Sequence, residues 1–173
     1  MPTAATARVR MIVFDVDGVF TDGRITLDTD GRESKAFHTR DGFGVRMARE
    51  AGLVTAVLSA RTAGAVDHRM KQLQIDHVLQ GVDRKREGIA TLAERTGIDP
   101  ADMAYLGDDI LDLNAMQIVG YPMAVADAAE ETCAAAAYVT QLPGGHGAIR
   151  DAVEHVLKAQ GKWDALVAQY VSR

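Results

Sequence analysis

Residues 11–23, MIVFDVDGVFTDG, place carboxylates directly after a short apolar run. The run at 11–14 predicts a strand covered on both faces, because a short apolar segment ending in a glycine-containing turn is typical of the centre of a parallel sheet. Asp15 and Asp17 then stand at the carboxyl end of that strand. The pattern fits either a solvated turn in which Gly18 provides the bend, or a site for a cation and a phosphate.

Further apolar segments alternate with amphipathic helical patterns along the 173 residues. We expect strands at 53–58, 77–79, 103–107, 122–126 and 137–140, and helices at 41–51, 62–73, 84–96, 109–118, 128–135 and 147–160. This alternation predicts the α/β class, with a Rossmann-like open parallel sheet covered by helices. Residues 24–38 interrupt it around Asp30-Gly31, which predicts a β-hairpin insertion after the first strand and no cap domain. We expect one domain over 1–173, with a C-terminal tail at 161–173.

Bulk composition excludes several classes of protein. A net charge of −5 argues against a nucleic-acid-binding face, which needs clustered basic residues. No apolar run approaches the roughly 20 residues of a membrane span, and the N-terminal MPTAATARVR lacks the apolar core of a signal peptide. We therefore expect a cytoplasmic protein with no membrane partner. The single cysteine, Cys133, allows no intramolecular disulfide, and we expect it to be buried and inert.

Polar residues also follow the later strands, at the edge where an open α/β sheet binds its ligands. They are Ser59 and Arg61 after the second strand, Lys85 after the third, and Asp108, Asp109 and Asp112 after the fourth. Each alone has a simpler interpretation, such as a helix cap or a solvated lysine. Their coincidence at successive strand ends favours the site for a cation and a phosphate.

At these residues the chain resembles the haloacid dehalogenase-like phosphatases, whose signatures are D-x-D-G, a Ser or Thr, a Lys and G-D-D-x-x-D. The segments FDVDGVFTDG, KAFHTRDGFGVR, QGVDRK, YLGDD and YVTQLPGGHGAIR are similar to the capless, tetrameric subgroup that acts on 3-deoxy-D-manno-octulosonate 8-phosphate. Ala60 departs from the usual glycine after Ser59, and His38 from an asparagine common before RDG. Because His38 bears on substrate choice, a nonulosonate 9-phosphate remains the alternative substrate.

The resemblance implies a covalent mechanism. Asp15 would attack phosphorus and form an aspartyl-phosphate. Asp17 would protonate the leaving sugar oxygen and later deprotonate the attacking water. Ser59 would donate to a phosphoryl oxygen, and Lys85 would neutralise its charge.

A magnesium ion is the implied cofactor, since Mg²⁺ prefers oxygen ligands and retains several waters. Asp15, the main-chain carbonyl of Asp17 and Asp108 would hold it. Asp109 is a further predicted metal-binding residue, and Asp112 is predicted to support the site. The sequence leaves open whether either touches the ion directly or through water.

Arginine side chains indicate the kind of substrate, because guanidinium groups match carboxylates geometrically. The resemblance implies substrate contacts, some reaching a neighbouring subunit's site, at His38, Thr39, Arg40, Asp41, Gly42, Arg46, Arg61, Arg69 and Lys85. A carboxylated sugar phosphate therefore fits better than a neutral one.

Two other classes of protein deserve comparison. A phospho-receiver signalling module also combines acids, a hydroxyl and a lysine, but its phosphorylated Asp should end a middle strand, where this chain has Ser59. Receiver chemistry also leaves GDDILD at 107–112 unexplained. A catalytically silent interaction domain would be expected to lose Asp15 or Asp17, and both are present.

The resemblance further implies a homotetramer, in which hairpins 24–38 associate and neighbours cover each open site. The tail adds an apolar stripe at helical spacing, which either joins that assembly or packs on the chain's own core. The stripe is Trp163, Leu166, Val167, Tyr170 and Val171.

Overall fold

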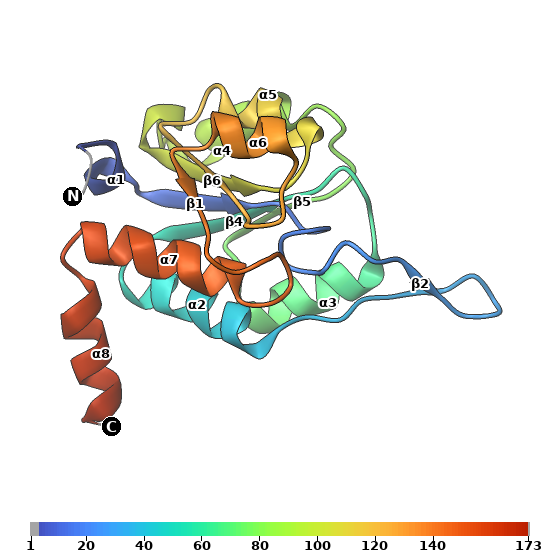
Figure 1. Ribbon diagram of the computed structural model, residues 1–173, viewed down its shortest axis with the longest axis horizontal. Helices are drawn as coiled ribbons and strands as arrows, with labels where there is room; N and C mark the ends of the chain where they lie inside the picture. Colours follow the sequence, from blue (N-terminus) through green and yellow to red (C-terminus); the bar gives the residue numbers. More distant parts are fainter. Residues whose placement is uncertain (1–3, 173) are drawn as a thin grey trace.

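The computed structural model describes residues 4–172, and a single parallel sheet lies at its centre (Figure 1). Its strands are β1 (Met11–Phe14), β4 (Val54–Leu58), β5 (His77–Leu79), β6 (Met103–Gly107), β7 (Tyr121–Ala124) and β8 (Tyr138–Val139). They lie in the order β5-β4-β1-β6-β7-β8, and every neighbouring pair is parallel. The α/β, Rossmann-like fold is thus confirmed.

Helices cover both faces of the sheet. They are α1 (Ala4–Arg8), α2 (Thr39–Glu50), α3 (Gly64–Leu73), α4 (Lys85–Thr96), α5 (Leu113–Met116), α6 (Glu130–Ala135), α7 (Ala148–Ala159) and α8 (Trp163–Val171), with 3-10 turns η1 (Pro100–Asp102) and η2 (Ile110–Asp112). Figure 1 shows α2, α3 and α7 on one face and α4, α5 and α6 on the other. The two layers leave the carboxyl ends of the strands open, with no cap domain among residues 4–172.

The residues of β1 alternate between two apolar clusters. Ile12 and Phe14 belong to the cluster that includes residues of α2, α3 and α7. Met11 and Val13 belong to the cluster that includes residues of α4 and α5. Burial on both sides explains why the strand is apolar at every position instead of alternating with polar residues.

One predicted helix differs in the structure. The segment 109–118 forms η2 and then α5, two short elements instead of one helix. Asp109 caps the turn through its own side chain, which accepts from Ile110 N at 2.7 Å. The Asp112 carboxylate accepts from the backbone N of Asp109 at 3.1 Å, and this reciprocal capping box tightens the turn.

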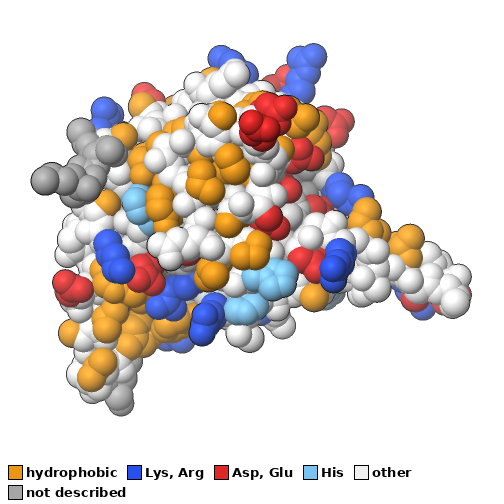
Figure 2. Space-filling model, viewed as in Figure 1, with side chains coloured by type: hydrophobic (Ala, Val, Ile, Leu, Met, Phe, Trp, Pro, Cys, Tyr) orange, Lys and Arg blue, Asp and Glu red, His pale blue; other side chains and the backbone are white. Residues whose placement is uncertain are grey.

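The predicted hairpin is present and projects from the body of the molecule (Figure 1). Its antiparallel strands are β2 (Thr26–Leu27) and β3 (Glu33–Ser34). Ile25 and Leu27 are 55% and 60% exposed. Hydrophobic side chains, in orange, are visible on this projection in Figure 2. The hairpin therefore presents apolar surface that the chain itself does not cover.

The C-terminal stripe packs largely on the chain's own core. Leu166 is buried, and Trp163 and Tyr170 pack against the same apolar cluster as α2 and α7, whereas Val171 is exposed. Cys133 is half-buried, so the expectation of full burial was wrong; it lies on the short helix α6, and its thiol donates to the backbone O of Ala128 at 3.6 Å. In the part of the chain that the structure describes, no helix is both long and apolar enough to span a bilayer.

Candidate active site

A cleft of about 260 Å³ opens at the carboxyl ends of β1, β4 and β6. It is lined by Asp15, Asp17, Gly23, Ser59, Ala60, Arg61, Lys85, Asp108, Asp109, Leu111 and Asp112. Parallel strands explain this convergence, because their carboxyl ends share one edge of the sheet. The structure thus brings together every residue that the sequence placed at the strand ends.

Asp15 is a buried carboxylate with a buried cation beside it. Its Oδ1 lies 2.9 Å from Lys85 Nζ, and the Asp15 and Lys85 side chains are only 9% and 3% exposed. Lys85 is the first residue of α4, so the start of this helix brings its ammonium group under the end of β1. The same ammonium group donates to Asp112 Oδ1 at 2.5 Å.

Asp112 is fully engaged within the protein. Besides Lys85, its Oδ1 accepts from the Tyr105 hydroxyl at 2.6 Å, and its Oδ2 accepts from the backbone N of Asp108 at 2.8 Å. The carboxylate is buried and accepts four hydrogen bonds. It therefore positions Lys85 and the loop that carries Asp108. Tyr105 was missed by sequence reasoning, because a tyrosine within an apolar strand is typical of the core.

Asp15, Asp108 and Asp112 bring carboxylate oxygens within 4.8 Å of one another. Burial, with Lys85 opposing it, raises the pKa of Asp15 to about 6. Burial and then the charges of Asp15 and Asp112 raise the pKa of Asp108 to about 8. For Lys85, burial acts to lower the pKa, but Asp15 and Asp112 outweigh it and the pKa is raised. One buried ammonium group thus contacts two of the three clustered carboxyl groups, those of Asp15 and Asp112.

This donor set fits a hard divalent cation such as Mg²⁺, which carboxylate oxygens bind and whose charge would offset their repulsion. Gly18 leaves space beside it for the carboxylate of Asp108. Its φ is +87°, and a Cβ at this position would lie 2.0 Å from Asp108 Oδ2. Only glycine lets the loop after β1 and the Asp108 carboxylate approach so closely.

Asp17 has quite different surroundings from Asp15. Its Oδ1 accepts from Lys35 Nζ, and its Oδ2 lies 3.7 Å from Arg61 Nε. Lys35 Nζ also lies 2.7 Å from Glu33 Oε1, and Glu33 Oε2 accepts from Arg61 Nη2 at 2.8 Å. We call Asp17, Lys35, Glu33 and Arg61 the hairpin charge ring. Sequence reasoning missed Glu33 and Lys35, although Lys35 begins the KAFHTRDGFGVR segment.

Ser59 and Asp109 both line the edge of the cleft. The buried Ser59 Oγ accepts from the backbone N of Arg61 at 3.2 Å. Backbone hydrogen bonds from Ser59 N to Leu79 O at 2.9 Å and from Val82 N to Ser59 O at 3.0 Å tie this residue to its neighbours. Ala60 therefore leaves Ser59 at the cleft.

Most other predicted substrate residues lie outside this chain's own cleft. Asp41 is one of them: its buried carboxylate accepts from Gly147 N and Arg150 N, both at 3.1 Å, and its role as a substrate contact stays a prediction. It caps α7, and its burial raises its pKa against these two bonds. No carboxylate oxygen of Asp41 faces the cleft that Asp15 lines.

The remaining ones lie along α2 and α3. His38 is the N-cap of α2 and accepts from Arg40 N at 3.2 Å, and Thr39 begins that helix. Arg46 binds Glu50 at 2.9 Å. The Arg69 guanidinium lies 5.8 Å from the Phe37 ring centroid, and a Cβ on Gly42 would come within 2.6 Å of its Nη2. Of the predicted substrate residues, only Arg61 and Lys85 line the cleft.

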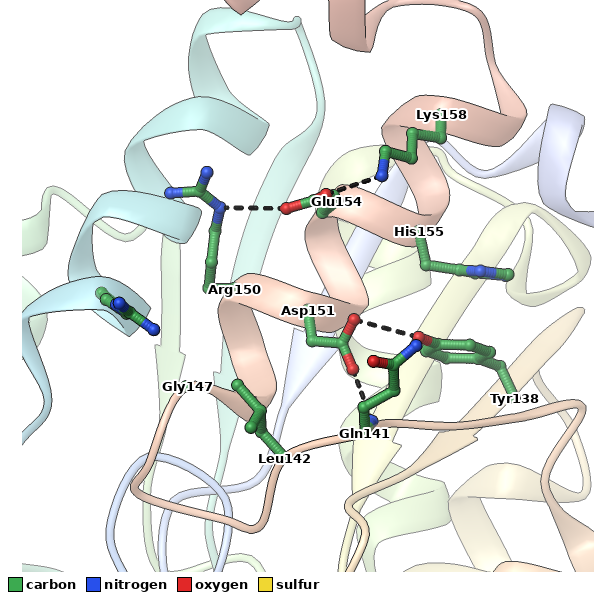
Figure 3. A pocket seen from close by; sticks show the side chains of 10 residues that line it. Tyr138, Gln141, Leu142, Gly147, Arg150, Asp151, Glu154, His155 and Lys158 are labelled. Carbon is green, nitrogen blue, oxygen red and sulfur yellow. Dashed lines mark hydrogen bonds and ion pairs between the residues drawn. The ribbon is translucent and has the colours of Figure 1, made fainter.

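A larger hollow of about 700 Å³ lies beside α7 (Figure 3). Asp151 accepts there from the Tyr138 hydroxyl at 3.1 Å and from Gln141 N at 2.6 Å. Glu154 lies 3.6 Å from Arg150 and 2.7 Å from Lys158. Both acids are thus paired within the protein, and among the described residues the cluster of three neighbouring carboxylates lies at the strand ends instead. The chemistry belongs to the smaller cleft.

Comparison with known proteins decides the family. The model of the haloacid dehalogenase-like hydrolases matches residues 68–150. The 3-deoxy-D-manno-octulosonate 8-phosphate phosphatase KdsC of Escherichia coli K12 is 39% identical over 168 residues, which cover 97% of this chain and 89% of that protein. The chain belongs to the KdsC family. KdsC of Salmonella typhimurium is 40% identical over 163 residues, 94% of this chain and 87% of that protein.

Solved structures of the KdsC family share the fold. The enzyme from Moraxella catarrhalis, in complex with magnesium ion, phosphate ion and KDO, is 36% identical with a TM-score of 0.93, over 96% of this chain and 95% of that chain. The cobalt-bound enzyme from Haemophilus influenzae is 35% identical with a TM-score of 0.90, over 93% and 94%. These likenesses confirm the predicted family and its hydrolase class.

Proposed function

We propose that this protein is a Mg²⁺-dependent phosphatase that hydrolyses 3-deoxy-D-manno-octulosonate 8-phosphate through an aspartyl-phosphate. One observation carries the proposal: the buried Asp15 carboxylate, 2.9 Å from Lys85, lies beside Asp108 in a chain that aligns with KdsC over 97% of its length. Nucleophile, cation and metal-binding acid are thus present together in a member of this family.

Asp15 and Asp17 divide the work of the two half-reactions. An Asp15 oxygen attacks phosphorus while the bond to the sugar oxygen breaks, and Asp17 gives that oxygen its proton. Asp17 then takes a proton from a water molecule, which attacks the phosphoryl group and releases phosphate and free Asp15. When bound by Asp15, the Asp17 main-chain carbonyl and Asp108, Mg²⁺ would screen the repulsion between nucleophile and phosphate.

Ser59 and Lys85 stabilise the transferring group. The Ser59 hydroxyl lines the cleft and donates to a phosphoryl oxygen, while the Lys85 ammonium group offsets the charge spread over the equatorial oxygens. Asp112 and Tyr105 act behind them by fixing where Lys85 points. A preorganised ammonium group needs no rearrangement during the reaction.

We further propose that the working form is a homotetramer. The support is the exposed apolar surface at Ile25 and Leu27 on the hairpin and at Ile110 and Leu111 beside the cleft, the last two 57% and 61% exposed. Such surface favours covering by a second copy. Arg46 and Arg69 do not line the cleft of their own chain, so a neighbouring subunit would have to bring them to the site. Cytoplasmic location and one domain over residues 1–173 stay predictions.

A phosphate-release assay tests the substrate. Purified protein with Mg²⁺ should act on 3-deoxy-D-manno-octulosonate 8-phosphate at least about tenfold more efficiently than on glucose 6-phosphate, because a charged hydrogen bond to Arg61 contributes roughly 1.5 to 3 kcal/mol. A nonulosonate 9-phosphate serves as the competing acidic substrate. Equal efficiency on the acidic and neutral sugars would overturn the sugar-acid assignment and leave only a general phosphatase.

A further inference from the structure

The hairpin charge ring alternates in sign and joins the hairpin to the loop after β1, which carries Asp17. Lys35 lies between Asp17 and Glu33, and Arg61 lies between the same two acids. The Lys35 side chain is only 1% exposed and that of Glu33 18%, whereas that of Arg61 is 47% exposed. The hairpin side of the ring is therefore largely shielded from solvent, whereas Arg61 is accessible from the cleft.

The Glu33 carboxylate accepts a hydrogen bond from the Arg61 guanidinium group, as the carboxylate of a bound ligand would. Its Oε2 lies 2.8 Å from Arg61 Nη2, a charge-assisted hydrogen bond of ordinary length. Arg61 is the arginine among the predicted substrate contacts that lines the cleft. An acidic substrate that uses this guanidinium group must therefore compete with a carboxylate already on it.

We propose that Glu33 is a built-in competitor for Arg61, which the carboxylate of an acidic substrate displaces, and that this displacement frees Asp17 for proton transfer. The inference rests on the proposed function and adds to it the means of choosing acidic sugars. Once Glu33 leaves Arg61, Lys35 is its remaining partner in the ring. Lys35 then shares more of its charge with Glu33 and holds the Asp17 carboxylate less firmly.

A neutral sugar phosphate lacks the group that opens the ring. It leaves Glu33 on Arg61, and Asp17 stays held by Lys35 on one oxygen and near Arg61 on the other. Selectivity then includes a step beyond binding, since the acidic substrate also releases the acid/base residue. Lys35 is a positioning residue in this scheme, because it acts through Asp17.

The first test is Glu33→Gln, which keeps the side-chain shape and removes the competing charge. We expect the KM for the acidic sugar phosphate to fall at least about threefold, while the KM for glucose 6-phosphate stays within about twofold. Asp30→Asn is the matched control, since Asp30 is 65% exposed on the same hairpin and pairs with Arg32. It should leave both constants unchanged.

A double-mutant cycle assigns the effect to Arg61. In an Arg61→Ala background, Glu33→Gln should no longer lower the KM of the acidic substrate. Lys35→Met removes the group that holds Asp17, so it should raise kcat on glucose 6-phosphate relative to kcat on the acidic sugar phosphate, and Lys35→Arg should keep the wild-type ratio. Thermal unfolding of each variant shows whether it is folded.

The outcomes separate this inference from the proposed function. If the wild-type protein prefers the acidic sugar but Glu33→Gln changes its KM by less than about threefold, raises it, or lowers both KM values equally, the competitor role is overturned and the phosphatase assignment stands. The role is also overturned if Glu33→Gln has the same effect without Arg61. If the wild type shows no preference for the acidic sugar, the sugar-acid assignment and this inference fall together.

Discussion

Asp15 and Asp17 are two positions apart and yet differ in nearly every physical respect. Asp15 is buried beside Lys85, whereas Asp17 lies at the cleft edge between Lys35 and Arg61. A nucleophile benefits from a fixed, desolvated position, and an acid/base group must exchange protons with a leaving group and then with water. Their environments match the two roles proposed for them.

Replacing Asp15 by Asn should abolish turnover and leave the fold intact. An amide is not a carboxylate nucleophile, so phosphate release should fall below about 1% of the wild-type rate. Steady-state phosphate release is the measurement, and the thermal midpoint is the control for folding. Retention of more than a few per cent of the wild-type rate would contradict the covalent mechanism.

Asp112→Asn should reduce both stability and kcat. The four groups around the carboxylate are all donors, so an amide NH₂ would face at least one of them without an acceptor. We expect a loss of about 1 to 3 kcal/mol in the free energy of unfolding. Asp102→Asn is the comparison, because Asp102 pairs with Arg8, whose side chain is 63% exposed. Equal effects of the two changes would contradict this account of Asp112.

The carboxylate cluster should make the metal-free fold less stable as pH rises. Burial and crowding raise the pKa of Asp15 from 3.8 to about 6 and that of Asp108 to about 8. Between about pH 4 and 8 the unfolded chain has therefore lost protons that the folded state retains, and the stability of the fold decreases with pH.

With EDTA, the thermal midpoint should fall on the order of 5 °C between about pH 5 and 8. Mg²⁺ should raise the midpoint more at the higher pH, because it binds the ionised carboxylates. Asp108→Asn should weaken both effects. A midpoint that rises over this interval in EDTA, or an Mg²⁺ effect independent of pH, would contradict the prediction.

At the level of elements, α2 and α7 hold the C-terminal part of the chain against the sheet. Asp41 of α2 caps the start of α7, and Gly44 lets the two helices meet closely. On α7, Arg150 lies between two rings, 5.3 Å from the Phe43 centroid and 5.1 Å from that of Trp163 on α8. The first turn of α7 thus contacts both α2 and α8.

Gly44→Ala tests this packing. A Cβ at residue 44 would lie 2.8 Å from Arg150 Cα, which is backbone and cannot rotate away, so we expect a destabilisation of about 1 to 3 kcal/mol. Gly64→Ala in α3 is the matched control, because nothing lies within 4 Å of its Cβ position. That change should be neutral or stabilise by up to about 1 kcal/mol. Denaturant unfolding compares them, and equal effects would contradict close α2–α7 packing.

At the scale of the whole molecule, the hairpin projects from the body of the protein (Figure 1), and no cap domain stands over the cleft at the strand ends among residues 4–172. The apolar side chains on the hairpin and beside the cleft are exposed in the single chain. Efficient phosphoryl transfer benefits from an enclosed, preorganised site. A second copy would provide the cover that a cap domain provides in other architectures.

Leu27→Lys should therefore shift the protein from tetramer toward smaller species and lower its phosphatase activity. It places a charge on a side chain that is 60% exposed on the hairpin. Val171→Lys makes the same kind of change at a side chain 83% exposed on α8 and should leave the assembly intact. Sedimentation velocity at micromolar concentration measures both variants. A monomeric wild type would contradict the proposed assembly.

The sequence by itself determined the α/β fold and the main residues of the cleft. Its apolar periodicity predicts the parallel strands, and parallel strands bring their carboxyl ends to one edge. Asp15, Ser59, Lys85 and Asp108 could therefore be placed in one site without coordinates. The hairpin was also predictable, since Asp30-Gly31 is a local turn signal.

Only the tertiary structure decided which polar groups pair. The Tyr105 hydroxyl on Asp112, the Asp41 cap on a backbone 106 residues away, and the contact of Lys35 with Asp17 depend on how distant segments meet. Local patterns report burial and turn geometry over a few residues. They carry no record of which donor faces which acceptor once the hairpin lies beside the sheet, because that pairing is set by the packing of the whole chain.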